Sequence, residues 1–344
     1  MHPLPDVRAA VRLLLALLLL ALLGLTGVAR AAPVSRVDSV GITVGDMERA
    51  LAFYTGVLPF EVAFEVEVQG DAYERLFGVF GMRARIVRLR LGEEEIELID
   101  YLAPEGRPVP TDSRSNDEWF QHIAIIVSDM DAAYAHLRQH NVQHASTGPQ
   151  TLPEWNPNAG GIKAFYFKDS DGNHLEILEF PPDKGDPRWH EPTDALFLGL
   201  DHTAIVVRDT KPSLRFFDYA LGLAHRGTSE NYDIEQERLN NVFGARLLIT
   251  SLGAPAGPAV EFLDYLAPAT GRPMPLDTRA NDLWHWQIRM ETPDLDGLEQ
   301  TLREAGAAFV SPGIVLMPDD ALGLGRALMV RSPVGHAVLI SETP

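Results

Sequence analysis

Three segments of the chain occur twice, in the same order and at a nearly constant offset. They are DYLAP at residues 100–104 and 264–268, GRP at residues 106–108 and 271–273, and the longer segments at residues 112–119 and 277–284. Spaced matches of this kind indicate an internal duplication, which constrains the fold more than any local pattern does. We therefore place one half at residues 34–180 and the other at residues 194–341. A linker rich in Pro, Asp and Gly joins them at residues 181–193.

Each half contains two copies of a shorter pattern, in which an alternating strand ends near an aspartate and an amphipathic helix follows. The four aspartates are Asp46, Asp129, Asp209 and Asp294. An aspartate in this position is typical of a helix N-cap, because its side chain accepts a hydrogen bond from a free backbone N–H. In the first and third units, strand-like runs come next, at residues 60–68, 84–91 and 96–102 and at residues 245–252 and 260–266. We number the four units modules 1 to 4.

The module pattern predicts an α+β fold. Each βαβββ module forms a small curved sheet with one helix behind it, and two modules side by side form a half-barrel. Four modules therefore pair into two curved-sheet half-barrels with the helices outside. The concave inner face of a half-barrel is a natural pocket for a small molecule.

The first 31 residues have the layout of a secretory signal peptide. Arg8 and Arg12 precede a Leu/Ala-rich run at residues 13–23, and Ala29-Arg30-Ala31 follows as a cleavage pattern. The apolar run is marginal for the ~20 residues that a membrane span needs, so we favour cleavage near Ala31 over an uncleaved anchor. We expect a periplasmic or secreted protein without membrane association after cleavage.

The amino-acid composition argues against nucleic acid as a partner and excludes chemistry that depends on cysteine. The chain has 29 Lys and Arg against 48 Asp and Glu, a formal charge of -19, and this excess repels nucleic acid. It has no cysteine, which excludes disulfides, thiolate metal ligands and cysteine nucleophiles and suits an oxidising compartment. We expect a small-molecule substrate and a monomer or homodimer.

Four ionisable residues occur in otherwise apolar strands. His122 and His202 each share a strand face with small or apolar residues, and Glu176 and Glu261 each lie between two apolar neighbours. A buried carboxylate is costly unless it is paired or binds a metal. Two imidazoles and two carboxylates make a site for one divalent first-row metal, and their chemistry leaves Zn, Ni, Fe, Mn and Co undistinguished.

Several stretches resemble the vicinal-oxygen-chelate family, which includes glyoxalase I, epimerases, extradiol dioxygenases and antibiotic-binding proteins. Residues 37–54 and 200–207 are similar to the opening of its module, and residues 169–178 resemble its closing strand. The resemblance covers nearly all of residues 34–341. It is specific for the fold and weak for the substrate, because one fold hosts many functions.

The resemblance implies metal ligands on the first and last strands of each module. Module 1 then offers Ser39 and Glu97, module 2 His122 and Glu176, module 3 His202 and Glu261, and module 4 Gln287 and Val338. If modules 1 and 2 pair, both sites are incomplete. If modules 2 and 3 pair, they give His122, Glu176, His202 and Glu261, and the substituted positions gather in a degenerate second site. We favour the second pairing, since it leaves one site intact.

The resemblance also implies a chemistry. In glyoxalase-type reactions a metal ion stabilises the charge that develops when a base removes a proton next to a carbonyl. The base is then Glu176, with Glu261 facing it across the ion, in a metal-dependent lyase or isomerase. The alternatives are an extradiol-type dioxygenase with Fe or Mn, whose facial triad needs two histidines and one carboxylate, and a non-catalytic binding protein.

Other residues are weaker candidates for the site. The loop at residues 155–161 is Gly-rich and has no counterpart in module 4, so Trp155 is a candidate for substrate contact. His174 could line the pocket, but His336 occupies the equivalent closing-strand position in the degenerate module, which favours a structural role for both. The duplicated segments carry Arg107, Arg114 and Trp119 and their copies Arg272, Arg279 and Trp284. Because they occur in both halves, we favour Asp–Arg pairs that hold the connections together over anion clamps.

Overall fold

The computed structural model describes residues 33–343, so the signal peptide predicted at residues 1–31 lies outside the described residues. Among the helices of the described residues, none is both long and apolar enough to cross a membrane.

The four modules have closely related elements. Module 1 consists of β1 (Arg36–Val44), α2 (Met47–Gly56), β2 (Glu61–Gln69), α3 (Asp71–Phe77), β3 (Arg83–Leu91) and β4 (Glu94–Ala103). Module 2 consists of β5 (Gln121–Val127), α4 (Met130–Gln139), β6 (Gln143–His144), β7 (Gln150–Thr151), β8 (Lys163–Lys168) and β9 (His174–Glu179), and the linker forms the short 3₁₀ helix η1 (Pro187–His190). Module 3 consists of β10 (Phe197–Val207), α5 (Thr210–Leu214), the π-helix η2 (Arg215–Ala220), β11 (Ala224–Asn231), α6 (Asp233–Asn240), β12 (Arg246–Gly253) and β13 (Ala259–Ala267). Module 4 consists of β14 (Trp286–Thr292), α7 (Leu295–Glu304), β15 (Ala308–Phe309), β16 (Val315–Leu316), β17 (Arg326–Arg331) and β18 (Ala337–Glu342).

The predicted N-caps are confirmed in all four modules. The side chain of each aspartate accepts a hydrogen bond from a backbone N–H in the first turn of its helix, as the contacts of Asp46, Asp129, Asp209 and Asp294 show. The five strands predicted in modules 1 and 3 after the first helix agree with the structure to within two residues at each end. The sequence pattern missed α3 and α6, each of which lies between the second and third strands of its module, and it also missed β11.

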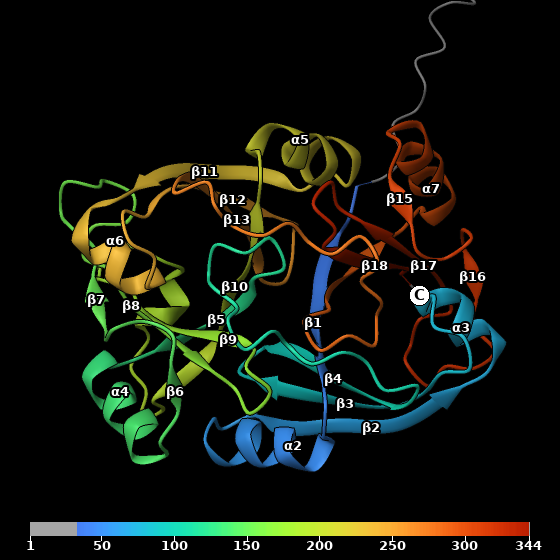
Figure 1. Ribbon diagram of the computed structural model, residues 1–344, viewed down its shortest axis with the longest axis horizontal. Coiled ribbons are helices and arrows are strands. Elements are labelled where there is room, and N and C mark those ends of the chain that lie inside the picture. The colour runs from blue at the N-terminus through green and yellow to red at the C-terminus, as the bar shows by residue number, and fades with distance from the viewer. Residues whose placement is uncertain (1–32, 344) are drawn as a thin grey trace, which may run out of the picture. The chain divides into compact units, whose positions relative to one another are not determined.

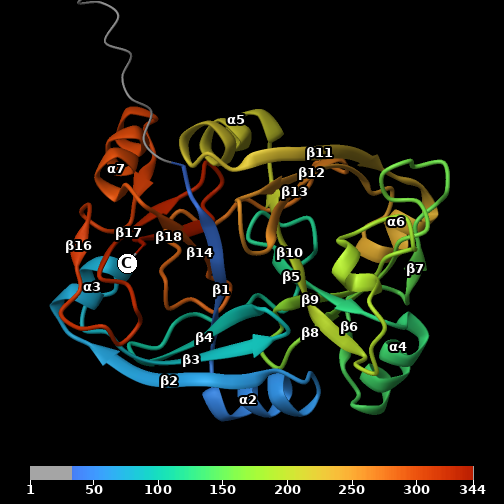
Figure 2. The ribbon, with the colours of Figure 1, turned by 180° about the vertical axis from the view of Figure 1, so that it is seen from behind.

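The strands form two curved sheets, each built from one module of each half. One sheet has the order β15-β17-β18-β14-β1-β4-β3-β2 with β16 beside β17, and the other has the order β11-β12-β13-β10-β5-β9-β8-β6 with β7 beside β8. We call them sheet A (modules 1 and 4) and sheet B (modules 2 and 3). The two sheets lie side by side, with α2, α4, α5 and α7 on the outside (Figures 1 and 2). This is the pairing that keeps the four candidate ligands in one sheet.

The duplicated loops fasten the two halves to each other reciprocally. Arg107 contacts Asp282 and Asp277 of the second half, and its copy Arg272 contacts Asp117 and Asp112 of the first half. Each guanidinium also stacks on a tryptophan, Arg107 on Trp284 and Arg272 on Trp119. Asp117 and Asp282 are nearly completely buried, so these pairs are protected from solvent on one side. These contacts agree with the structural role predicted for the duplicated arginines. We call the two reciprocal sets of contacts the clasp.

His336 connects the sheets and gives stability a pH dependence. Its Nε2 lies 3.0 Å from the carbonyl oxygen of Val206 on β10, and burial lowers the pKa of His336 from 6.5 to about 4. Below pH 6.5, His336 is protonated in the unfolded chain but stays neutral in the native protein. The unfolding free energy therefore falls as the pH falls, by about 1.4 kcal/mol per pH unit.

We therefore predict that His336→Gln flattens the pH profile of stability. Between pH 6.5 and 5, wild type is expected to lose about 2 kcal/mol more unfolding free energy than the variant, whose amide can still donate to Val206. Urea titrations at each pH measure this difference. Parallel profiles for the two proteins would show that His336 does not titrate on unfolding in this range.

Candidate metal and substrate site

The four predicted ligands come together on four adjacent strands of sheet B. Along the order β13-β10-β5-β9 these strands contribute Glu261, His202, His122 and Glu176. The register places Ala204 between His122 and Glu261, and Ala124 between His202 and Glu176. Because both alanines are fully buried and small, the four longer side chains can converge over them on the concave face.

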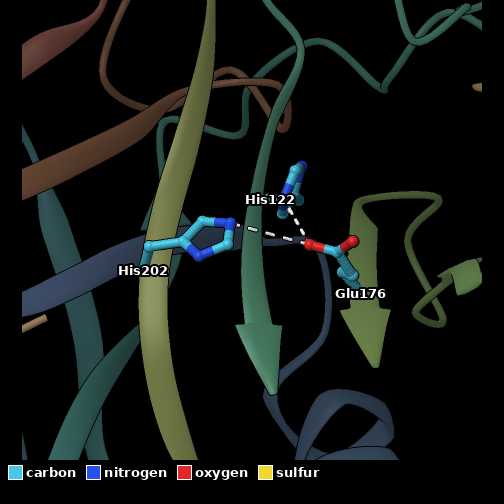
Figure 3. A group of neighbouring side chains, drawn as sticks. All are labelled: His122, Glu176 and His202. Carbon is cyan, nitrogen blue, oxygen red and sulfur yellow. Dashed lines mark ion pairs between the residues drawn. The ribbon is translucent and has the colours of Figure 1, made fainter. Parts of the chain in front are cut away.

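Glu176 makes the shortest contact in the cluster and touches both histidines. Its Oε2 lies 3.0 Å from Nε2 of His122 and 3.6 Å from Nε2 of His202, and Figure 3 shows both imidazoles directed at this carboxylate. Glu261 contacts His202 but not His122, with its Oε2 3.5 Å from Nε2 of His202. His122, Glu176 and His202 each offer a ligand atom within 4.8 Å of the others, a spacing that a single ion can bridge.

The donor set fits a divalent metal. Both ring nitrogens of His122 are buried, and among the described residues neither makes a well-oriented hydrogen bond, although Nε2 lies 3.0 Å from Oε2 of Glu176. Leaving a buried polar group without a hydrogen bond is costly. A metal on Nε2 would satisfy one of the two nitrogens. Glu176 and Glu261 supply the negative charge that a cation requires, and two imidazoles with two carboxylates suit first-row divalent ions.

Asp201 orients His202 from behind. Its Oδ2 lies 2.9 Å from Nδ1 of His202, and its Oδ1 accepts a hydrogen bond from Nε1 of Trp189 in the linker helix η1. Burial by itself lowers the pKa of His202, but Glu261, Asp201 and Glu176 outweigh it and raise that pKa to about 10. The carboxylate–histidine contact fixes Nδ1 as the donor and leaves Nε2 facing the cluster, the arrangement usual for a metal-binding histidine. Asp201 was missed from the sequence.

We predict that Asp201→Asn weakens binding of a divalent metal by about 10- to 100-fold. The asparagine amide is a poorer acceptor, so it orients His202 less firmly and makes its Nε2 less basic. Competition with a chromophoric chelator measures the affinity. Asp183→Asn, an exposed change that also removes one negative charge from the linker, is the matched control. Equal affinities for the two variants would show that Asp201 does not support the site.

A cavity of about 350 Å³ opens above the cluster and reaches all four candidate ligands. Its wall is largely apolar, with Leu152, Ile162, Leu178, Phe180, Ile249 and Leu263. Asn158, Ser229, Asn231 and Ser251 are among the polar residues of the wall. The volume fits a small molecule whose oxygen atoms approach the cluster.

Trp155 and His174, the weaker candidates, do not line this cavity. Trp155 is 44% exposed and stacks on Tyr232 at 4.2 Å, so it fastens its loop to module 3 while the neighbouring Asn158 faces the cavity. His174 packs against Phe120, which also packs against His122, and burial lowers the pKa of His174 to about 3. Both contacts are between distant segments, which local sequence patterns do not reveal.

Sheet A lacks both histidines of the candidate site and carries two arginines beside the glutamate that it retains. Ser39 and Gln287 stand at the positions of His202 and His122, and Glu97 stands at the position of Glu261. Where sheet B has Ala124, sheet A has Arg289, which is 3% exposed.

The guanidinium groups make sheet A a closed ion-pair cluster. Arg289 and Arg88 lie 2.9 and 2.6 Å from Oε1 of Glu97, and both also contact Asp38. The carboxylates there are already paired with cations that the chain itself supplies, so among the described residues the candidate metal group is confined to sheet B.

The strand register corrects one predicted position of the second site. Lys168 pairs with His174 in module 2, and Arg331 pairs with Ala337 in module 4, so Leu339 rather than Val338 corresponds to Glu176. His336 likewise corresponds to Asn173 and not to His174. The two turns have the same length, but the histidine is the last turn residue in module 4 and the first strand residue in module 2, so alignment on the histidines placed module 4 one residue out of register.

Comparisons with known proteins agree with this architecture. The family model described as Glyoxalase/Bleomycin resistance protein/Dioxygenase superfamily matches residues 36–177. A protein from Actinomyces sp named 2-epi-5-epi-valiolone epimerase is 35% identical over 150 residues, which cover 42% of this chain and 79% of that protein. The uncharacterized protein YaeR of Escherichia coli (strain K12) is 30% identical over 146 residues, covering 42% of this chain and 95% of YaeR.

Two solved structures share the fold over most of the chain. Glyoxalase I from Zea mays superposes with a TM-score of 0.58 at 15% identity, covering 89% of this chain and 92% of that one. A putative dioxygenase from Bacillus subtilis superposes with a TM-score of 0.57 at 14% identity, covering 91% and 87%. The family-model match and the identities to the two shorter relatives show that the chain belongs to the glyoxalase/bleomycin resistance protein/dioxygenase superfamily, and the two solved structures agree with it in fold.

Proposed function

We propose that the protein is a metal-dependent enzyme that removes a proton next to a carbonyl group of a small, oxygen-chelating molecule, as a lyase or isomerase. The observation that carries the proposal is the convergence of His122, Glu176, His202 and Glu261 at one end of the cavity. The name of the Actinomyces relative supports it, because an epimerase changes the configuration at one carbon and removal of a proton is a common way to do so.

His122, Glu176 and His202 are the proposed core of the metal site, with Glu261 beside them. When bound, a divalent ion supplies a Lewis acid that polarises the carbonyl group and stabilises negative charge on its oxygen. The apolar wall of the cavity excludes bulk water from the reacting atoms, which strengthens the electrostatic interactions there.

The family resemblance implies that Glu176 is the base. We propose that Glu261 takes the proton instead. Glu176 is held between both imidazoles and its side chain is 5% exposed, so it is placed as a ligand. The side chain of Glu261 is 21% exposed and contacts His202 alone among the ligands, which leaves its carboxylate accessible to a molecule in the cavity. Burial also raises the pKa of Glu261, in the direction that makes a carboxylate a stronger base.

Deuterium exchange tests the proposed reaction. Metal-loaded protein in deuterated water is expected to exchange the proton next to the carbonyl of small α-hydroxyketones, with hydroxyacetone and 2-hydroxycyclohexanone as the first probes, and NMR follows the signal. Chelator-treated protein and Glu261→Gln are the comparisons. Two results together would overturn the proposal. Elemental analysis would find no divalent metal in the purified protein, and proton exchange would be no faster than in buffer for a panel of such ketones.

An extradiol-type dioxygenase is the second candidate. It is favoured by one observation, because the three closest donors are two histidines and one carboxylate, the composition of the facial triad of non-haem iron oxygenases. Ring cleavage of catechol by the Fe(II)-loaded protein, with matching oxygen uptake, would select this function over proton transfer if the cleavage is absent under anaerobic conditions and absent with the Zn form.

A further inference from the structure

The wall of the sheet B cavity contains one side chain with a permanent positive charge, Arg226. No carboxylate of the described residues lies within ion-pair distance of it, whereas Arg107, Arg208 and Arg272 are all paired with aspartates or glutamates. Its Nη2 donates to the backbone carbonyl of Ala254 at 3.0 Å, which positions the guanidinium and leaves its other N–H groups free for a ligand.

The backbone holds Arg226 in this place. The pairing of β11 with β12 shifts register between His225 and Gly227, so Arg226 lies at a β-bulge, a feature that redirects a side chain. The guanidinium then rests against Gly253, where a Cβ atom would lie only 2.0 Å from its Cζ. A glycine at residue 253 is therefore a condition for the observed position of Arg226.

Arg226 lies in a part of the cavity wall that is separated from the metal ligands. Gly227 next to it pairs with Ser251, which pairs with Glu261, so two strand spacings, roughly 10 Å, separate the bulge from the nearest ligand. Thr228, Ser229 and Ser251 are also part of the wall and could add hydroxyl donors. The formal charge of the chain is -19, which repels anionic ligands in general. A cation without a carboxylate partner in the cavity wall attracts such ligands locally.

We propose that Arg226 determines the substrate class by binding an anionic oxygen group, a carboxylate or a phosphate, at the end of the substrate opposite the chelating oxygens. This inference rests on the proposed function, because it assumes that the other end of the molecule approaches the metal ligands. A guanidinium is suited to this role, since it donates two parallel hydrogen bonds to such a group.

Matched hydroxamates test the inference, because a hydroxamate binds a metal through two oxygens. One probe carries a tail of two to four methylenes that ends in a carboxylate, a second ends in a phosphonate, and a third ends in a methyl group. Calorimetry on the zinc-loaded protein is expected to give at least about tenfold tighter binding of an anionic probe than of the neutral one, with a preference that shrinks as salt is raised. The stronger of the two anionic probes identifies the group.

Three variants localise the effect. Arg226→Gln is expected to lower the preference to about one while binding of the neutral probe stays unchanged. Gly253→Ala, which keeps every charge but displaces the guanidinium, is expected to reduce it as well. Arg215→Gln, an exposed change of the same charge outside the cavity, is the control and should keep the wild-type preference.

Two negative results have different meanings. Equal binding of anionic and neutral probes to wild type, or a preference that survives in Arg226→Gln, would overturn the inference while the metal site stands. Failure of every hydroxamate to bind the zinc-loaded protein would instead overturn the proposed chelation at the metal, and the assignment of Arg226 would fail with it.

Discussion

Replacing Glu176 by glutamine is expected to weaken binding of a divalent metal more than about 100-fold, because the change removes the carboxylate that both imidazoles face. The loss should exceed that of Asp201→Asn, which acts only through His202. Replacing Glu261 is expected to cost less than about tenfold in metal affinity, since this carboxylate contacts one histidine. Its effect falls on proton exchange instead, where loss of a general base costs about 10²- to 10⁴-fold. Equilibrium competition with a chelator measures the first quantity, and deuterium incorporation measures the second.

The control for these two variants is Glu97→Gln. Glu97 occupies the position of Glu261 in sheet A, but Arg88 and Arg289 already pair with it. We expect one metal per chain in wild type and in this control, and far-UV circular dichroism can verify that the variants fold. If Glu176→Gln keeps full affinity while Glu261→Gln loses the metal, the proposed division between ligand and base is reversed.

The sequence was informative about the fold because each module repeats a local signal. An aspartate that caps a helix and a strand that alternates apolar residues depend on near neighbours, so Asp46 and its three counterparts could be located without coordinates. The helices α3 and α6 were missed, since both are short and neither has a side-chain N-cap. The pairing of modules followed from a chemical argument, namely which combination brings complete ligand sets together.

The candidate site was harder to predict where it depends on register or on distant segments. Val338 was placed one residue away from the true counterpart of Glu176, because the alignment matched two histidines that occupy different positions at the end of equally long turns. Arg289 could have been noticed, since an arginine in the apolar run of module 4 stands where module 2 has Ala124. Arg226 carries no local signal, because its importance comes from a bulge and from Gly253 on the neighbouring strand.

Adding one methyl group at the clasp between the halves, by Gly106→Ala, is expected to lower the unfolding free energy strongly. A Cβ atom at Gly106 would lie 1.6 Å from the backbone oxygen of Asn281, so Gly106→Ala must move one backbone segment away from the other. That movement separates Arg107 from Asp282, whose carboxylate is buried and is then left without its cation. We expect the unfolding free energy to fall by about 3 to 5 kcal/mol, the usual cost of breaking one side of a buried pair.

Gly148→Ala is the matched control for this prediction, because nothing lies within 4 Å of a Cβ atom there and the same methyl group is added. Its unfolding free energy should stay within about 0.5 kcal/mol of wild type in the same urea titrations. Gly271→Ala tests the symmetry of the clasp, since its Cβ would lie 1.7 Å from the backbone oxygen of Asn116 and would displace Arg272 from Asp117. Similar losses of unfolding free energy in Gly106→Ala and Gly271→Ala would show that both connections hold the two halves together. A loss below about 1 kcal/mol at both would mean that the loops adjust freely and that the sheets are held together elsewhere.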